Sequence, residues 1–188
     1  MGRPRRSEPT NVPLHLTARG VRRLKVFADD EDYETYTELL ASAARTHAWT
    51  VLGFCLLPNH IHLVVRLREP TLSRGMHWLH STHARRFNAR HGYKGHAFDA
   101  RFFSRPIASE EHLFRVFRYV SMNPVVAGLC ADPAEWRWSS FAAISGDRDD
   151  FPFVAVRRVR LLYGRTQASG AQGFAEAVRS AIPAELIV

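Results

Sequence analysis

The stretch Pro58-Asn59-His60-Ile61-His62-Leu63-Val64-Val65 places two histidines two residues apart in a run of residues that favour β-strands. Successive side chains of a strand point to opposite faces, so His60 and His62 share one face and lie about 7 Å apart along the strand. Two imidazoles at this spacing can bind one metal ion, and they can also form a half-buried hydrogen-bonded pair. The stretch alone leaves both interpretations open.

The residues on either side of this stretch predict a β-hairpin. Residues 49–57 are apolar and β-favouring, Pro58-Asn59 is typical of a turn, and residues 60–67 return as the second strand. We therefore expect the two histidines near the tight end of the hairpin.

Further outward, the chain alternates predicted strands and helices. We expect additional strands at residues 12–17 and 101–107, and helices at residues 30–47, at residues 73–91 with Ser73 as N-cap, and from Ser109 to the residue before Pro124. The order βαββαβα packs most simply as a compact antiparallel sheet. The predicted fold class is α+β, with a ferredoxin-like or RRM-like antiparallel sheet and helices on one face.

The composition divides the chain into three parts. Residues 1–11 are predicted to be a flexible basic arm, residues 12–145 one folded domain, and residues 146–188 a C-terminal helical extension. A chain of 188 residues that is 46% hydrophobic is large enough to bury a full core.

The net charge of +8 indicates a polyanionic partner, and nucleic acid is the leading candidate. Nearly all of the positive charge is arginine, which can bind a phosphate through two hydrogen bonds. His77, His80 and His83 step by three along a predicted helix, which we interpret as a phosphate-facing side rather than a metal site. The predicted DNA-contact residues are Arg3, Arg5, Arg6, Arg19, Arg74, Arg85, Arg86, Arg101, Arg115 and Arg118. For the three arginines of the arm, a solubilising tail is the alternative.

Cysteine usage and hydropathy predict a soluble cytoplasmic protein. Cys55 and Cys130 have no C-x-x-C partner and lie among apolar neighbours, as buried free thiols in a reducing compartment do. No signal-peptide pattern and no run of about 18 apolar residues is present, so we expect no membrane partner. No phosphate-cradling Gly-rich loop is present, so we expect no nucleotide cofactor.

The helix predicted from Ser109 carries Tyr119 and Asn123 four residues apart, and therefore on one face. A tyrosine phenol can attack phosphorus, and an amide oxygen can bind a divalent cation. Two simpler interpretations remain: Tyr119 packs in the core, and Asn123, before Pro124, caps a further helical turn over residues 125–129.

A set of ordered motifs carries a family resemblance over residues 12–145. The motifs, in chain order, are His15-Leu16-Thr17-Ala18-Arg19-Gly20, Pro58-Asn59-His60-Ile61-His62, Leu72-Ser73-Arg74-Gly75-Met76, Phe87-Asn88, Gly95-His96-Ala97-Phe98 with Arg101-Phe102, Arg118-Tyr119-Val120, Asn123-Pro124-Val125-Val126-Ala127-Gly128-Leu129 and Trp138-Ser139-Ser140. In these motifs the chain resembles the REP-associated tyrosine transposases, a branch of the small single-tyrosine HUH transposases of insertion sequences. So many segments in one order are far more specific than a lone His-x-His pair.

The resemblance implies the HUH nuclease fold and an enzyme that cleaves and rejoins single-stranded DNA near hairpins of repeated palindromic elements. In this family pattern Tyr119 matches the nucleophile, which forms a 5′-phosphotyrosine. His60 and His62 match the metal-binding histidines, and Asn123 matches the third polar ligand. The repeat-associated branch resembles a monomeric enzyme, so we expect a monomer, with a dimer as the alternative.

Family habit and the small number of ligands favour Mg²⁺ or Mn²⁺ as the cofactor, although imidazoles also accept Zn²⁺, Ni²⁺ or Co²⁺. Two other functions stay open at this point. One is a non-catalytic DNA- or RNA-hairpin-binding module on the same scaffold, and the other is a metal-dependent hydrolase that uses water instead of Tyr119.

Overall fold

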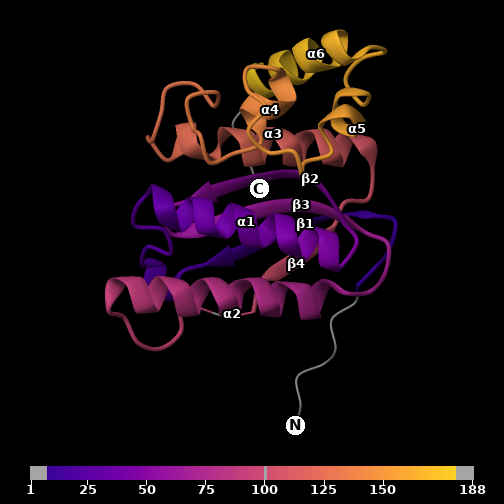
Figure 1. Cartoon of the computed structure of the whole chain (residues 1–188). Helices are drawn as coiled ribbons and strands as arrows, with labels where there is room; N and C mark the ends of the chain where they lie inside the picture. The colour runs from indigo at the N-terminus through magenta and orange to yellow at the C-terminus, as the bar shows by residue number, and fades with distance from the viewer. Residues whose placement is uncertain (1–7, 100, 181–188) are drawn as a thin grey trace.

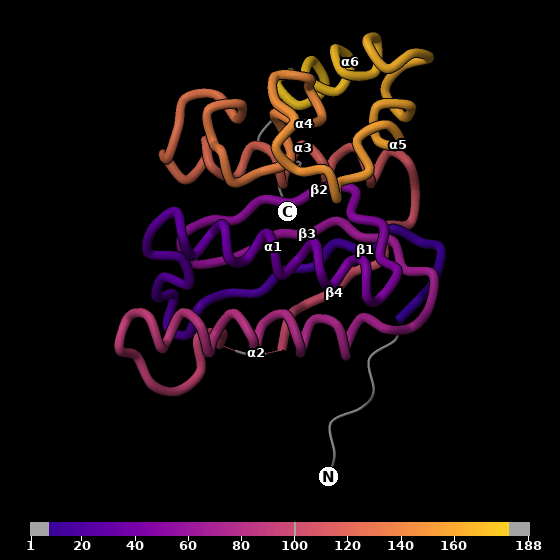
Figure 2. Tube along the Cα trace, in the orientation of Figure 1, coloured from indigo at the N-terminus to yellow at the C-terminus, as the bar shows by residue number. Residues whose placement is uncertain are grey.

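A four-stranded antiparallel sheet forms the centre of the molecule. The computed structural model describes residues 8–99 and 101–180. The strands are β1 (Pro13–Arg19), β2 (Trp49–Leu57), β3 (His60–Leu67) and β4 (Phe103–Pro106), and they lie in the order β2-β3-β1-β4. The hairpin β2–β3 and the central position of β1 can be followed in Figure 2.

Helices cover both faces of this sheet. Helices α1 (Asp30–Thr46) and α2 (Leu72–His91) lie side by side over one face (Figure 1). On that face Trp49 packs so closely on α2 that a Cβ atom at Gly75 would lie 2.2 Å from the Trp49 ring. Helix α3 (Glu110–Val126) covers the other face, where a Cβ atom at Gly53 would lie 3.1 Å from the Phe117 ring.

The α+β class and the antiparallel sheet are confirmed, and the position of α3 adds to the prediction. The prediction placed the helices on one face, as α1 and α2 are, whereas α3 packs on the opposite face. In β2 the register shifts between Val51 and Gly53, so that Val51 pairs with Val65 and Gly53 pairs with Val64. Val51 and Gly53 therefore point to opposite faces of the sheet, and both are buried. A strand that is buried on both faces needs cover on both sides, which α3 supplies.

The predicted C-terminal helices are present as α5 (Val156–Arg160) and α6 (Gln167–Arg179), and α6 packs on α3. A further short helix, α4 (Phe141–Ser145), precedes the predicted extension, and a 3-10 helix, η1 (Val21–Arg23), follows β1. The Phe174 ring on α6 contacts Phe117 on α3 at a centroid distance of 5.9 Å. The segment between α3 and α5 also runs along the outer side of β2, with bridges from Ser139 to Cys55 and from Val154 to Val51.

The start of α2 differs from the prediction. The helix begins at Leu72 rather than after Ser73, and its N-cap residue, Thr71, makes no capping hydrogen bond with its side chain. Instead the carboxylate of Glu8 accepts hydrogen bonds from the backbone N–H groups of Leu72 and Ser73, at 2.9 and 2.8 Å. The predicted arm is therefore already attached to the domain at Glu8, and residues 1–7 lie outside the described part of the chain.

Helix α3 continues through Pro124, so the prediction that it ends before this residue is wrong. Pro124 is buried, and the Asn123 side-chain amide donates to the carbonyl of Tyr119 at 2.7 Å. Burial of the Pro124 ring offsets the backbone hydrogen bond that a proline cannot make. The chain turns at Gly128, whose φ of 69° is left-handed, and residues 125–126 belong to α3 rather than to a separate turn.

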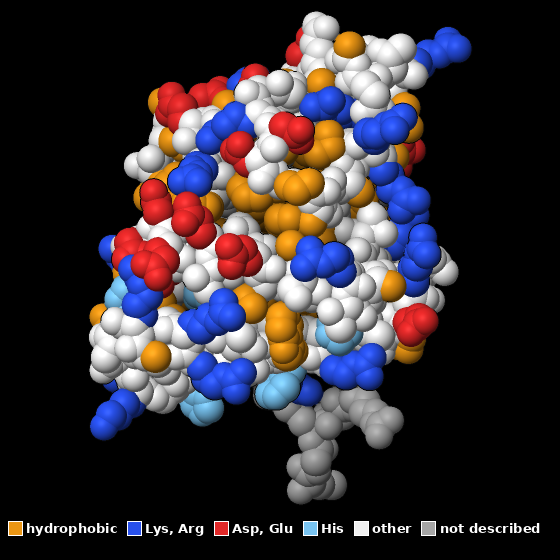
Figure 3. Space-filling view, viewed as in Figure 1, with side chains coloured by type: hydrophobic (Ala, Val, Ile, Leu, Met, Phe, Trp, Pro, Cys, Tyr) orange, Lys and Arg blue, Asp and Glu red, His pale blue; other side chains and the backbone are white. Residues whose placement is uncertain are grey.

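Across the described residues, no helix combines the length and the apolar character that crossing a bilayer requires. On the face shown in Figure 3, lysine, arginine and histidine side chains gather along the lower margin, over α2.

Candidate active site

The two histidines of β3 point into one pocket. His62 lies opposite Thr17 on β1 and Cys55 on β2, and His60 lies opposite Arg19. The two imidazole rings have centroids 5.1 Å apart and are nearly perpendicular. The alternation expected for a strand therefore places them together.

Tyr119 reaches the same pocket from α3. Its ring centroid lies 5.3 Å from that of His62, with the two rings perpendicular, and the residue is 39% exposed. Because of this exposure, Tyr119 is not a buried core aromatic, which was the simpler of the two interpretations of this residue.

The pocket has a volume of about 320 Å³. It lies between β1, β3, α3 and the segment that precedes β4. Its lining residues are Thr17, Ala18, Arg19, His60, His62, Asp99, Arg101, Phe103 and Tyr119. Two of the arginines predicted to contact DNA, Arg19 and Arg101, are therefore beside the histidines.

Hydrogen bonds hold the two imidazoles by their Nδ1 atoms. His62 Nδ1 lies 3.0 Å from His15 Nε2, and His60 Nδ1 lies 2.6 Å from the Asn59 side-chain oxygen. The Nε2 atom of His62 is buried and has no hydrogen-bond partner among the described residues. A buried nitrogen of this kind is costly unless something binds it.

Burial keeps all three imidazoles neutral at pH 7. It lowers the pKa of His62 well below its ordinary value and that of His15 to about 4, with nearby cationic groups as smaller causes. It also lowers the pKa of His60, with Arg19 as the second cause. A neutral imidazole keeps the lone pair that a metal ion needs, so these residues fit a divalent cation.

Asn123 does not line this pocket in the described part of the structure. Its amide nitrogen donates to the Tyr119 carbonyl at 2.7 Å, and this hydrogen bond leaves the amide oxygen as the atom that could bind a cation. Its role as a third ligand stays a prediction.

The other predicted DNA-contact residues are spread over the molecule. Arg74, Arg85 and Arg86 are exposed on α2, and Arg115 forms an exposed ion pair with Glu111 at 2.5 Å. Arg118 donates to the carbonyls of Ala177 and Val178, so in this structure it joins α3 to the end of α6 rather than pointing to solvent. Arg3, Arg5 and Arg6 lie outside the described residues.

Of the histidine series on α2, His83 does not belong to the phosphate-facing side that we expected. His77 is exposed, but His83 is only 1% exposed and is hydrogen-bonded to the carbonyl of Val26 at 2.8 Å. The series drifts around the helix, because three residues are less than one full turn.

His15, which belongs to a motif quoted from the sequence but was given no role there, contacts two residues of the candidate site. It lies on β1, stacks on His62 with ring centroids 5.3 Å apart and approaches Tyr119 to 6.1 Å. In the sequence, the two-residue spacing of His15, Thr17 and Arg19 indicates that they share one face of β1. That this face adjoins His60 and His62 follows only from the pairing of β1 with β3.

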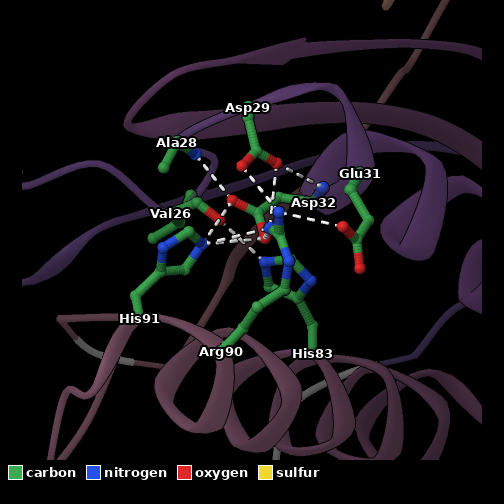
Figure 4. Close-up of polar contacts among 8 residues, drawn as sticks. All are labelled: Val26, Ala28, Asp29, Glu31, Asp32, His83, Arg90 and His91. Atoms are coloured by element: carbon green, nitrogen blue, oxygen red, sulfur yellow. Dashed lines mark hydrogen bonds and ion pairs between the residues drawn. The ribbon is translucent and has the colours of Figure 1, made fainter.

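A second cluster of potential metal ligands, Asp29, Asp32 and His91, is an ion-pair network (Figure 4). Arg90 donates to Asp29 at 2.9 and 2.7 Å and to Asp32 at 2.6 Å, and His91 lies 2.9 Å from Asp32. The guanidinium occupies the space between the carboxylates and repels a cation there. The cluster joins the start of α1 to the end of α2.

Comparisons with known proteins bear on the fold and the family of the chain. No curated protein sequence matches the chain. Among solved structures, the fold is similar to one described as "Structure of the REP associates tyrosine transposase bound to a REP hairpin", with a TM-score of 0.63 and 20% sequence identity. The similarity covers 81% of this chain and 90% of that chain.

The sequence model of the family "Transposase IS200 like" matches residues 9–123, which include β1, the His60–His62 pair and Tyr119. Because this match spans more than half of the protein, the chain belongs to the IS200-like transposase family.

Proposed function

We propose that the protein is a metal-dependent single-stranded DNA endonuclease and strand transferase. It cleaves and rejoins DNA near hairpins of repeated palindromic elements through a 5′-phosphotyrosine at Tyr119. The observation that carries the proposal is the convergence of Tyr119 from α3 with His60 and His62 from β3 on one pocket. The hairpin bound to the structurally similar transposase supports the choice of substrate.

His60 and His62 would hold the divalent cation, Mg²⁺ or Mn²⁺, and Asn123 is the candidate for a third ligand. When bound, the cation polarises the scissile phosphate and neutralises negative charge that develops on its oxygens. The unpartnered, buried Nε2 atom of His62 is the feature that favours this role over a simple hydrogen-bonded pair.

Tyr119 acts as the nucleophile. Its phenolic oxygen forms a bond to phosphorus while the bond from phosphorus to the 3′-oxygen of the preceding nucleotide breaks, and the phenolic proton passes to solvent. The departing 3′-oxygen takes up a proton and becomes a hydroxyl. Arg19 and Arg101 bind the phosphate in the pocket and orient it for attack.

Rejoining follows from the same chemistry in reverse. The phosphotyrosine retains the energy of the phosphodiester, so a second 3′-hydroxyl can attack it and release Tyr119 without a nucleotide cofactor. We propose that the protein does this as a monomer in the cytoplasm.

The test is an adduct assay. The protein is incubated with end-labelled, single-stranded hairpin DNA from the region that flanks its gene, together with Mn²⁺, and analysed on a denaturing gel. We expect a covalent protein–DNA band that requires the metal and is absent from Tyr119→Phe, while Tyr119→Phe still binds the hairpin.

Two other outcomes would replace the proposal. Hairpin binding without any adduct or cleavage, in the wild-type protein and with native flanking repeats, would favour the non-catalytic binding module. Metal-dependent cleavage that Tyr119→Phe retains would favour a hydrolase that uses water.

A further inference from the structure

A second hollow, which we call the α2 groove, lies between α2 and residues 95–99 and 101–102, and it has a volume of about 610 Å³. Asp99 and Arg101 line both the α2 groove and the pocket that holds Tyr119, so the two hollows adjoin. We propose that the α2 groove binds the unpaired nucleotides next to the scissile phosphate. The proposal rests on the proposed function, because it takes single-stranded DNA to be the substrate.

The groove is held open by the protein's own hydrogen bonds. The backbone of Asp99 donates to Arg19 at the end of β1, and that of Val21 donates to Ala97, both at 2.9 Å. The Asn88 side chain on α2 donates to the carbonyl of Gly95 at 2.8 Å. The residues 95–99 are therefore held in place by hydrogen bonds at both ends of the groove. Because this side of the groove is already formed, little ordering is needed when a ligand binds.

The floor of the groove is flat and uncharged. The rings of His80 and Phe98 stack with centroids 4.1 Å apart, and Tyr36 holds the Nε2 atom of His80 at 3.2 Å. Burial lowers the pKa of His80 to about 3, so its ring is neutral at pH 7. A half-buried, neutral aromatic surface is what an unpaired base stacks on, whatever its sequence.

The rim of the groove is basic. His77, Arg85, His96 and Arg101 are exposed there. Among the described ion pairs, none involves Arg85 or Arg101, and the hydrogen bond of Arg85 goes to the Thr82 hydroxyl at 3.3 Å. Cations without carboxylate partners above an apolar floor suit a nucleotide, which has phosphates outside and a base inside.

Asp99 sets a limit on how the strand lies. Its carboxylate is exposed where the groove meets the active-site pocket, and it repels a phosphate at that point. It can accept a hydrogen bond from the amino group of a base, such as N4 of cytosine. We therefore place a base, rather than the backbone, beside Asp99.

The test measures binding of two hairpins with the same stem, one with an unpaired extension and one blunt, by fluorescence anisotropy. Tyr119→Phe protein is used throughout, so that no cleavage occurs. We expect Arg85→Glu to weaken binding of the extended hairpin about tenfold or more and binding of the blunt hairpin about twofold or less. Arg85→Lys keeps the charge, so we expect it to bind the extended hairpin with nearly the affinity of the protein that retains Arg85.

The matched control is Arg45→Glu, the same charge change at an exposed residue of α1 outside the groove. It should lower the affinity for both hairpins equally and slightly, through long-range electrostatics alone. Equal losses for the two hairpins in Arg85→Glu, or no loss in either, would overturn the proposal.

The two proposals can fail separately. Binding that depends on the extension and on Arg85 supports the groove even if the adduct assay detects no phosphotyrosine. If the adduct forms but Arg85→Glu weakens binding of the two hairpins equally, the proposed function stands and the proposal for the α2 groove is rejected.

Discussion

The Nδ1 atom of His62 lies 3.0 Å from the Nε2 atom of His15, and the two rings stack between β1 and β3. If Nε2 of His62 binds a cation, Nδ1 must carry the proton and donate it to His15. His15 therefore acts as an acceptor that fixes the tautomer and the orientation of His62, as the outer partners of metal-bound histidines do.

Removing this acceptor should weaken metal binding without touching a ligand. We expect His15→Leu to lower the Mn²⁺ affinity of the DNA-free protein by about 10–100-fold, the usual effect of losing such a partner. His15→Gln, whose amide oxygen can accept the same hydrogen bond, should recover part of the loss. Calorimetric titration with Mn²⁺ measures both, and equal affinities in His15→Leu and wild type would contradict the positioning role.

Glu8 should stabilise α2 from outside the helix. Glu8→Ala removes the acceptor for the N–H groups of Leu72 and Ser73, and we expect a loss of about 1 kcal/mol in the free energy of unfolding, as for a lost N-cap. Urea denaturation measures this loss. Glu38→Ala, an exposed glutamate of α1, is the control and should change stability by less than about 0.5 kcal/mol. An unchanged midpoint in Glu8→Ala would show that water replaces the carboxylate at no cost.

Gly75 should not tolerate a methyl group. Gly→Ala inside a helix ordinarily stabilises by up to about 1 kcal/mol. Here the new Cβ atom would lie 2.2 Å from the Trp49 ring, so we expect Gly75→Ala to destabilise the protein by about 1–3 kcal/mol. Thermal unfolding is the measurement, with the exposed Arg86→Ala on the same helix as control. A raised melting temperature would mean that Trp49 moves aside easily.

The network around Arg90 should make stability depend on acid pH. Hydrogen bonds from Arg90 hold the pKa of Asp29 below its ordinary value of 3.8. As the pH falls, the unfolded chain takes up this proton first. The ionised Asp29 carboxylate therefore contributes fully to the stability of the fold well above pH 3.8. This contribution is lost as the pH falls through the lower pKa of Asp29 in the folded state.

We expect Asp29→Asn to lower the melting temperature at pH 6, with a difference from wild type that shrinks between about pH 5 and pH 3. Circular dichroism melts across this range measure the difference. The same difference at every pH would rule out the ionised carboxylate as its source.

Local patterns were sufficient for much of the fold. Strand alternation places His60 and His62 on one face, and helical spacing places Tyr119 and Asn123 together on one helix. These features depend on neighbours within a few residues, which the sequence displays directly.

Features that depend on distant contacts were not predictable. His15 and His62 are separated by 47 residues, and their contact requires the register of β1 against β3. The cap that Glu8 places on α2 spans an even longer separation. The continuation of α3 through Pro124 depends on packing that overrides the local preference of proline to end a helix.

The bridges from Ser139 and Val154 to β2 have a consequence for self-association. They occupy the outer side of β2, so in the described structure a strand from another molecule can join the sheet only beside β4. Strand β4 is short and ends in Pro106, which has no N–H group to donate. Both margins are thus poor templates for strand addition, which protects the protein from aggregating through its sheet at high concentration.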